Sequence, residues 1–294
     1  MSRPIYIVDV FAERPYAGNQ LAVVLDADGL TDHAMQQVAA EMNYSETAFA
    51  GSAPERDGGF RVRIFTPARE LVFAGHPILG TAWAINHHLS PDATAAVRLN
   101  LACGQILVEF ESSVERRDVA WFLAPPVSLG ATCAREPIAK ALGISTEDIE
   151  TKIPVQTLSA GTSAMIVPVR SLAALRRSRL DLDAFAPLAA EGFPPLVYLF
   201  CAETRQSGND LSARFFFEAH GVREDPATGN GAAFLGAYLL QHQVPRGGAL
   251  SLRIEQGFEI RRPSLVLLRA KSDGHIREVS VGGRVIPVVQ GRLL

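Results

Sequence analysis

The segment FAGHPILG, residues 73–80, places a glycine, a histidine and a proline directly before an apolar helical pattern. Pro77 suits the first position of a helix, where its missing N–H costs nothing, and Gly75 lets the backbone bend closely just before it. The first N–H groups of a helix lack intrahelical partners and the helix dipole is positive there, so such an end attracts anions. We therefore expect His76 to stand beside a place suited to a carboxylate or a phosphate.

A second helix start of the same kind is predicted at DPATGNG, residues 225–231. Gly229 and Asn230 stand there before another apolar helical pattern, as Gly75 and His76 stand before the first. If the two halves of the chain pack around a pseudo-twofold axis, these ends converge on one cleft. Two converging anion sites would suit a small substrate that carries one or more carboxylates.

Three carboxylates lie near these ends and are candidates for proton transfer. Glu224 and Asp225 come just before the second helix, and Glu46 lies where an earlier helix gives way to a strand. A carboxyl group at a dry junction can have a raised pKa and then serve as general acid or base. Three of the titratable residues have an ordinary alternative: Asp225 as a turn or N-cap residue, Glu46 as a solvated turn residue, and His76 as a helix-capping or structural residue.

Strand-like runs rich in Val, Ile, Phe and Leu recur along the chain, and helical patterns are few. One helix is predicted from a Thr31 cap to about Asn43, with an apolar stripe at helical spacing. This stripe comprises Met35, Val38, Ala39 and Met42. The other two helices follow the two glycine-containing segments and are apolar on most of their surface, so each must be surrounded by a sheet.

The two apolar helices are also preceded by similar strands, beginning RIF at Arg63 and RFF at Arg214. This indicates an internal duplication with a period of about half the chain, too long for a solenoid. We predict an α+β fold of two similar domains, each a mixed β-sheet wrapped around a central helix. The predicted domains span residues 1–118 and 119–283, and the tail 284–294 returns to the first.

Composition narrows the class of protein. The 294 residues are 48% hydrophobic, which is enough for a full core. The net charge of −3 gives no sign of nucleic-acid binding. Asp9 interrupts the first apolar run, and the chain has no run long enough to cross a membrane, so a cytoplasmic location is expected. Cys103, Cys133 and Cys201 are widely spaced, which disfavours a disulfide framework or a zinc site.

Several long motifs, in order, cover nearly the whole chain: VDVFAERPYAGNQLAVV, AEMNYSETAF, RIFTPARELVFAGHPILGTA, RFFFEAHGVREDPATGNGAA, IEQGFEIRRPS and VGGRVIPVVQG. With them the chain resembles the PhzF-like phenazine-biosynthesis family, whose fold is similar to that of diaminopimelate epimerase. The resemblance implies two α+β domains with the active site between them. It also implies an isomerase that needs no cofactor or metal and forms a homodimer.

The resemblance implies roles for individual residues. Glu46 matches the glutamate that moves the proton, while His76 and Asp225 match residues that assist the transfer or hold the substrate. Gly75 and Gly229 match glycines whose amides bind carboxylate oxygens. We add Asn230, Asn19 and Ser45 as candidate substrate-binding residues, although Asn19, after Gly18, is most simply a hairpin-turn residue.

The chain departs from the family pattern at several positions. Asn230 stands where the phenazine enzymes have a serine, and Arg261 replaces a glycine. Because Asn230 lies in the substrate loop, we expect a specificity different from that for dihydro-hydroxyanthranilate. The first hypothesis is thus an isomerase of a small carboxylated metabolite. The alternatives are an amino-acid racemase or epimerase that uses two thiols, and a carboxylate-binding protein without turnover.

Overall fold

A computed structural model describes residues 2–89, 94–111, 119–217, 224–272 and 277–294, and the chain divides into two compact units. Unit 1 comprises Met1–Leu123 and Val281–Leu294, and unit 2 comprises Ala124–Ser280. The sequence placed the first boundary after residue 118. The structure moves it to Leu123, because the strand β8 pairs with β7 of unit 1. The return to unit 1 comes at Val281, three residues earlier than expected.

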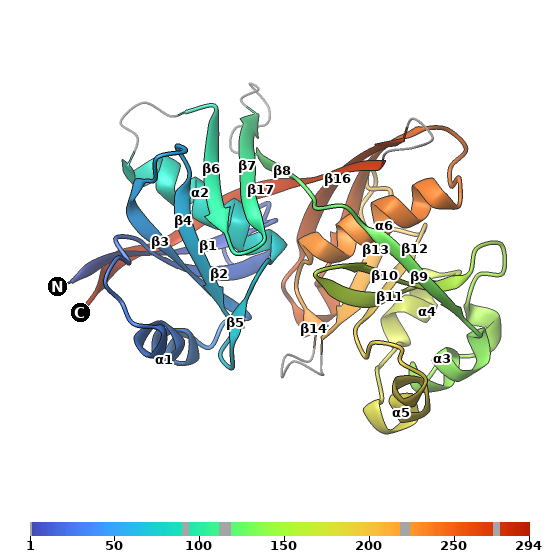
Figure 1. The fold of residues 1–294 in the computed structure, drawn as a ribbon. Coiled ribbons are helices and arrows are strands. Elements are labelled where there is room, and N and C mark those ends of the chain that lie inside the picture. The colour runs from blue at the N-terminus through green and yellow to red at the C-terminus, as the bar shows by residue number, and fades with distance from the viewer. Residues whose placement is uncertain (1, 90–93, 112–118, 218–223, 273–276) are drawn as a thin grey trace. The chain divides into compact units, whose positions relative to one another are not determined.

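Unit 1 alternates strands with two helices (Figure 1). Its elements are β1 (Arg3–Val10), β2 (Asn19–Val24), α1 (Asp32–Met42), β3 (Glu46–Pro54), β4 (Phe60–Phe65), β5 (Glu70–Leu71), α2 (Gly75–Leu89), β6 (Ala96–Leu101), β7 (Gly104–Glu111), β8 (Val119–Leu123) and most of β17 (Arg277–Leu293). Strand pairing runs from β17 through β1, β2, β3, β4, β6 and β7 to β8, which pairs again with β17. The sheet therefore closes on itself.

Helix α2 is the centre of unit 1. It contacts β1, β2, β3, β6, β7 and β8, and from Gly75 to Ala82 every residue is buried. A helix that is apolar all round has no face for water and must be covered on every side. The prediction of a sheet wrapped around a central helix is confirmed for this unit.

Helix α1 lies on the outside of unit 1 and begins where the sequence indicated. The Thr31 side chain accepts a hydrogen bond from the Ala34 amide at 3.2 Å, and Asn43 ends the helix in the left-handed conformation. Met35 and Ala39 are buried against the sheet, and the other two residues of the predicted stripe are partly buried beside them. Both the cap and the stripe are confirmed.

Unit 2 repeats the arrangement with additional short helices. Its elements are β9 (Ser128–Cys133), α3 (Arg135–Ala141), η1 (Thr146–Asp148), β10 (Val155–Ala160), β11 (Thr162–Pro168), α4 (Leu172–Arg177), α5 (Leu182–Ala190), β12 (Val197–Cys201), β13 (Leu211–Phe216), β14 (Glu224–Asp225), α6 (Gly229–Gln241), β15 (Ala249–Gln256), η3 (Phe258–Ile260) and β16 (Ser264–Ser272). Strand pairing runs from β9 through β10, β11, β12, β13 and β15 to β16, and β14 pairs with β13.

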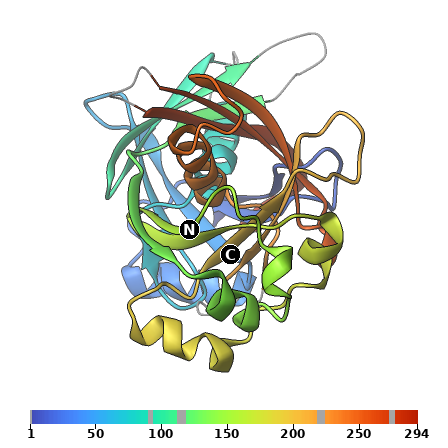
Figure 2. The same cartoon turned by 90° about the vertical axis from the view of Figure 1, so that its right-hand side faces the viewer.

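Helix α6 holds the central place in unit 2. It lies among the strands of this unit (Figure 2) and contacts β10, β11, β15 and β16. Its buried residues run almost without interruption from Gly229 to Leu240. Helices α3, α4 and α5 were not predicted from the sequence. They pack around a second apolar cluster with β11 and β12, and α3 and α5 lie side by side (Figures 1 and 2). Among the described residues, no helix is long and apolar enough to cross a membrane.

One glycine fixes the loop that follows β15. Gly257 has φ of +77°, and a Cβ there would lie 2.3 Å from the Arg262 carbonyl oxygen and 2.5 Å from that of Pro226. The close approach holds the segment after β15 against the residue that follows Asp225. Arg261, at a position where the resemblance implies a glycine, also adopts a positive φ, of 61°.

We predict that Gly257→Ala lowers the free energy of unfolding by at least about 3 kcal/mol, because it adds a backbone clash to the cost of the left-handed conformation. Gly143→Ala is the matched control: its φ is +63° and nothing lies within 4 Å of its Cβ position. That control should cost about 1–2 kcal/mol. Urea unfolding of both variants measures the difference, and equal costs would show that the close approach is not constraining.

Candidate functional site

In unit 1, a carboxylate and an imidazole meet at the start of α2. Glu46 is the first residue of β3 and pairs with Leu21 of the parallel strand β2, while His76 is the second residue of α2. Their side chains are only 8% and 4% exposed, and Glu46 Oε2 lies 3.5 Å from His76 Nε2. Thirty positions apart in sequence, the two residues meet because the buried helix begins against the ends of these strands.

Asn19 connects this pair to Ser45. The Ser45 hydroxyl donates to Asn19 Oδ1 at 3.2 Å, which leaves the Asn19 amide nitrogen as a donor toward His76 Nδ1, also at 3.2 Å. Together these contacts orient the ring so that Nε2 faces Glu46. Asn19 is therefore more than a turn residue: it opens β2, is fully buried, and orients the histidine ring.

Burial decides the charge of the imidazole. It lowers the pKa of His76 to about 3, because a charged ring would lose its hydration at this position. His76 is thus neutral near pH 7 and accompanies Glu46 as a polar group without charge. Among the described residues, His76 Nε2 makes no hydrogen bond, so this nitrogen has capacity left for a ligand.

In unit 2, the residues before α6 form a second buried polar group. The Thr228 hydroxyl donates to Asp225 Oδ2 at 2.5 Å. The Gln256 side-chain amide donates to the Asp225 carbonyl at 2.9 Å and to Thr228 Oγ1 at 3.0 Å, and its oxygen accepts from the Thr228 amide at 3.3 Å. These contacts fix the Asp225 carboxylate beside the start of the helix.

Two further side chains complete this end of α6. Tyr198 is buried, and burial together with the nearby Asp225 charge raises the pKa of its hydroxyl, so the phenol stays protonated. Asn230 is half-buried at the second helical position, and within the described part of the chain its Oδ1 has no hydrogen-bond partner. Gly231 packs directly on the Tyr198 ring, where a Cβ would lie 2.4 Å from a ring carbon.

The structure thus gathers the predicted site residues into two sets. Unit 1 brings together Asn19, Ser45, Glu46 and His76. Gly75 lies beside them as the first residue of α2. Unit 2 holds Asp225, Gly229 and Asn230 at the start of α6. Sequence reasoning missed Gln256 and Thr228. Gln256 lies in the motif IEQGFEI at the end of a strand. The only local signal for its role was an amide side chain at a strand end, next to a glycine.

The chain matches the family model "Phenazine biosynthesis-like protein" (PhzC-PhzF) over residues 8–291, and it belongs to that family. A relative from Pseudomonas aeruginosa, named trans-2,3-dihydro-3-hydroxyanthranilate isomerase, is 36% identical over 292 residues, which cover 97% of each chain. A solved structure of a predicted epimerase from the same organism is 32% identical to this chain, with a match that covers 99% of each chain and a TM-score of 0.82.

A PhzF-family structure from Bacillus anthracis has a TM-score of 0.90 at 24% identity, covers 100% of this chain and 99% of its own, and shows the same fold. The family resemblance and the α+β fold class are confirmed by these comparisons. The chain is a PhzF-like isomerase.

The neutral His76 links stability to pH. The unfolded chain takes up a proton at the ordinary histidine pKa of 6.5, whereas the folded chain does so only near 3, so the unfolding free energy falls as the pH drops through this window. We predict a contribution of about 1.4 kcal/mol per pH unit. In His76→Asn this contribution is absent, so the stability advantage of the native chain should shrink from pH 7 to pH 4.

The control is His33→Asn, which removes an exposed histidine from α1. Urea unfolding at several pH values should give this variant a curve parallel to the native one. A His76→Asn curve that is also parallel would mean that His76 titrates normally in the folded chain.

Proposed function

We propose that the chain shifts a proton along the framework of a small unsaturated carboxylate, with Glu46 as the acid and base. The observation that supports this proposal is the buried pair of Glu46 and neutral His76 at the start of α2. Glu46 takes a proton from a C–H group next to the unsaturated bond, the double bond moves, and the carboxyl group returns the proton to another carbon. Substrate and product have the same atoms and the same oxidation state.

The other predicted residues bind and orient the substrate in this proposal. The amides at Gly75 and Gly229 begin two buried helices, and such ends favour the negative charge of a carboxylate. His76 Nε2–H donates to charge that develops in the transition state, as a neutral donor suited to an anion. Asp225, held by Thr228 and Gln256, accepts from a hydroxyl or amino group of the substrate. A homodimer and a cytoplasmic location are expected on the resemblance.

The two-thiol racemase is the weaker alternative. Ala74 and Thr228 occupy the positions directly before the helix starts, where that mechanism needs cysteines. Burial raises the pKa of Cys133 and of Cys201 to about 11, so neither thiol is ionised near pH 7. A binding protein without turnover would need the same anion sites but no proton acceptor, and the exchange experiment below separates it from the isomerase.

We predict that Glu46→Gln keeps the fold and most of the ligand affinity but lowers turnover by about 10² to 10⁴, because an amide cannot accept and return a proton. The assay follows isomerisation and C–H exchange in deuterated water, with trans-2,3-dihydro-3-hydroxyanthranilate and a panel of other unsaturated amino and hydroxy acids. Glu41→Gln, on the exposed face of α1, is the control. Near-native turnover in Glu46→Gln would make Glu46 a structural turn residue.

Asn230 is predicted to set specificity, because its Oδ1, which has no hydrogen-bond partner in the described part of the chain, and its amide give the start of α6 both an acceptor and a donor. Asn230→Ser should change the ranking of affinities across the same panel, measured by calorimetry, while thermal unfolding stays that of the native chain. If the two forms bind every panel member equally, the departure from the family serine has no role in substrate choice.

A further inference from the structure

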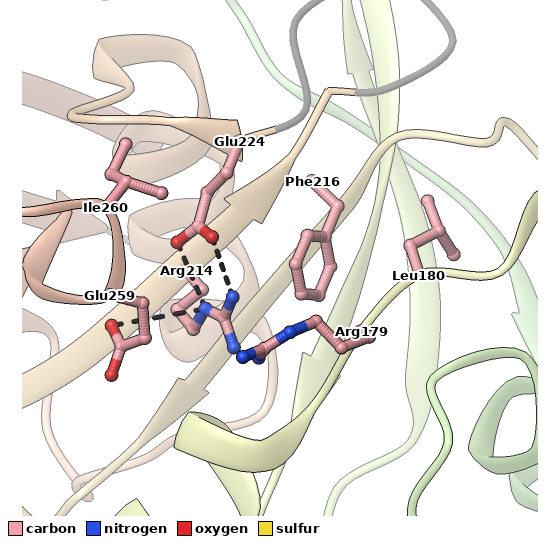
Figure 3. A pocket seen from close by; sticks show the side chains of 7 residues that line it. All are labelled: Arg179, Leu180, Arg214, Phe216, Glu224, Glu259 and Ile260. Atoms are coloured by element: carbon pink, nitrogen blue, oxygen red, sulfur yellow. Dashed lines mark hydrogen bonds and ion pairs between the residues drawn. The ribbon is translucent and has the colours of Figure 1, made fainter.

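A cavity of about 390 Å³ lies in unit 2, on the face of β13 and β14 away from Asp225. Phe215 pairs with Asp225 and Phe216 with Glu224, so neighbouring residues of this ladder point to opposite faces of the sheet. Figure 3 shows the side chains that line the cavity. They are Arg179, Leu180, Arg214, Phe216, Glu224, Glu259 and Ile260. The Arg214 and Glu224 side chains therefore lie on the face of this ladder opposite to the Asp225 side chain.

Arg214 links three elements on this face. Its Nε and Nη2 donate to the two oxygens of Glu224 at 3.0 and 2.6 Å, which makes the pair bidentate. Its Nη1 donates to three carbonyls at the end of α4, those of Leu175, Arg176 and Ser178, at 2.8 to 3.2 Å. The guanidinium also lies over the Phe216 ring, 4.7 Å from its centre. The Arg214 and Glu224 side chains are 2% and 3% exposed.

The strand that Arg214 holds is very short. β14 consists only of Glu224 and Asp225, and Pro226 follows, so few backbone hydrogen bonds can fix its place. The bidentate contact to Glu224 therefore anchors the residue next to Asp225. From there the chain runs through Thr228 into α6, so the same anchor bears on the position of the helix start.

Unit 1 contains the same device. Arg63 Nε and Nη2 donate to the two oxygens of Glu70 at 2.7 and 2.6 Å, and the guanidinium lies 5.1 Å from the centre of the Phe65 ring. Glu70 begins the two-residue strand β5 and precedes Gly75 by five positions, as Glu224 precedes Gly229. Here the two charged side chains are 17% and 41% exposed. The arginine–glutamate contact recurs despite the difference in burial, so in each half it accompanies the short strand that leads into the central helix.

We propose that Arg214 is a positioning residue: through its bidentate contact with Glu224 it sets the Asp225 carboxylate and the start of α6. Only the kinetic consequence of this inference rests on the proposed function; the effect on the backbone of residues 224–231 does not. A shift of about 1 Å in an active group can cost about 100-fold in rate. Lysine keeps the charge of Arg214 but cannot make the two parallel hydrogen bonds.

The first test needs no substrate. Amide hydrogen exchange of Arg214→Lys should become faster in residues 224–231 while β11 and β12 stay protected. In Arg214→Ala, guanidinium ion at a low, non-denaturing concentration should restore protection, because the cavity gives it access to Glu224, whereas urea should not. If Arg214→Ala does not fold, the lysine variant and the neutral pair Arg214→Met with Glu224→Gln carry the test.

Arg179→Ala is the matched control. Arg179 lines the same cavity but is exposed, and its Nη1 donates to the Arg176 and Ser178 carbonyls, two of the three that Arg214 also contacts. The variant leaves the bidentate contact with Glu224 in place, so exchange in 224–231 should not change. Unchanged exchange in Arg214→Lys would overturn the proposal, as would faster exchange spread evenly over unit 2. An equal effect of Arg179→Ala would also overturn it, because the charge of the cavity or the shared carbonyl contacts, and not the bidentate contact with Glu224, would then be the cause.

The second test is kinetic, with the panel member that the native chain turns over. Arg214→Lys should lower kcat by about 10- to 100-fold with a much smaller change in KM. Asp225→Asn is measured beside it. Native turnover in Asp225→Asn would refute the role of Asp225 in the proposed function and leave the positioning inference to the exchange data. Loss in Asp225→Asn with native kcat in Arg214→Lys would refute the positioning inference alone.

Discussion

The burial of α2 and α6 is the constraint on which the other features of the structure depend. Both helices are apolar on nearly all sides, so each needs strands around it, and the sheet of unit 1 closes for that reason. A helix enclosed in this way has its first turn fixed against strand ends. Gly75 and Gly229 are buried there, with amide groups that no helical carbonyl satisfies. The anion-seeking ends are therefore a consequence of how the core is packed.

The same burial controls the polar side chains around these ends. A buried charge must be paired and hydrogen-bonded, or it must be neutralised. Both outcomes are present: His76 is neutral, whereas the Arg214 guanidinium is paired with Glu224 and donates to three carbonyls. Breaking either arrangement would leave a desolvated group without a partner. The polar networks are thus as tightly determined as the apolar core, and this gives the site its fixed geometry.

The sequence predicts those features that have a local cause. Thr31 as a cap and the spacing of Met35 and Ala39 indicate α1, and the Gly–His–Pro segment indicates the start of α2, because each signal lies within one or two turns. Helices α3, α4 and α5 have six to nine residues, too few to show a clear period. The contacts of Gln256 with Thr228 and of Arg214 with α4 join residues 28 to 39 positions apart. No local sequence pattern around Gln256 or Arg214 indicates which residue it will contact.

The duplicated scaffold carries different chemistry in its two halves. An arginine–glutamate contact, a two-residue strand and a buried helix start recur in both, but the second helical residue is His76 in one and Asn230 in the other. The carboxylates also differ: Glu46 comes from the strand β3 and faces a ring nitrogen, whereas Asp225 comes from β14 and is held by a hydroxyl. Glu46 thus lies beside a neutral imidazole, an arrangement that supports the role in proton transfer proposed for Glu46. Asp225 sits in a fixed hydrogen-bond network, which suits a carboxylate that orients a substrate.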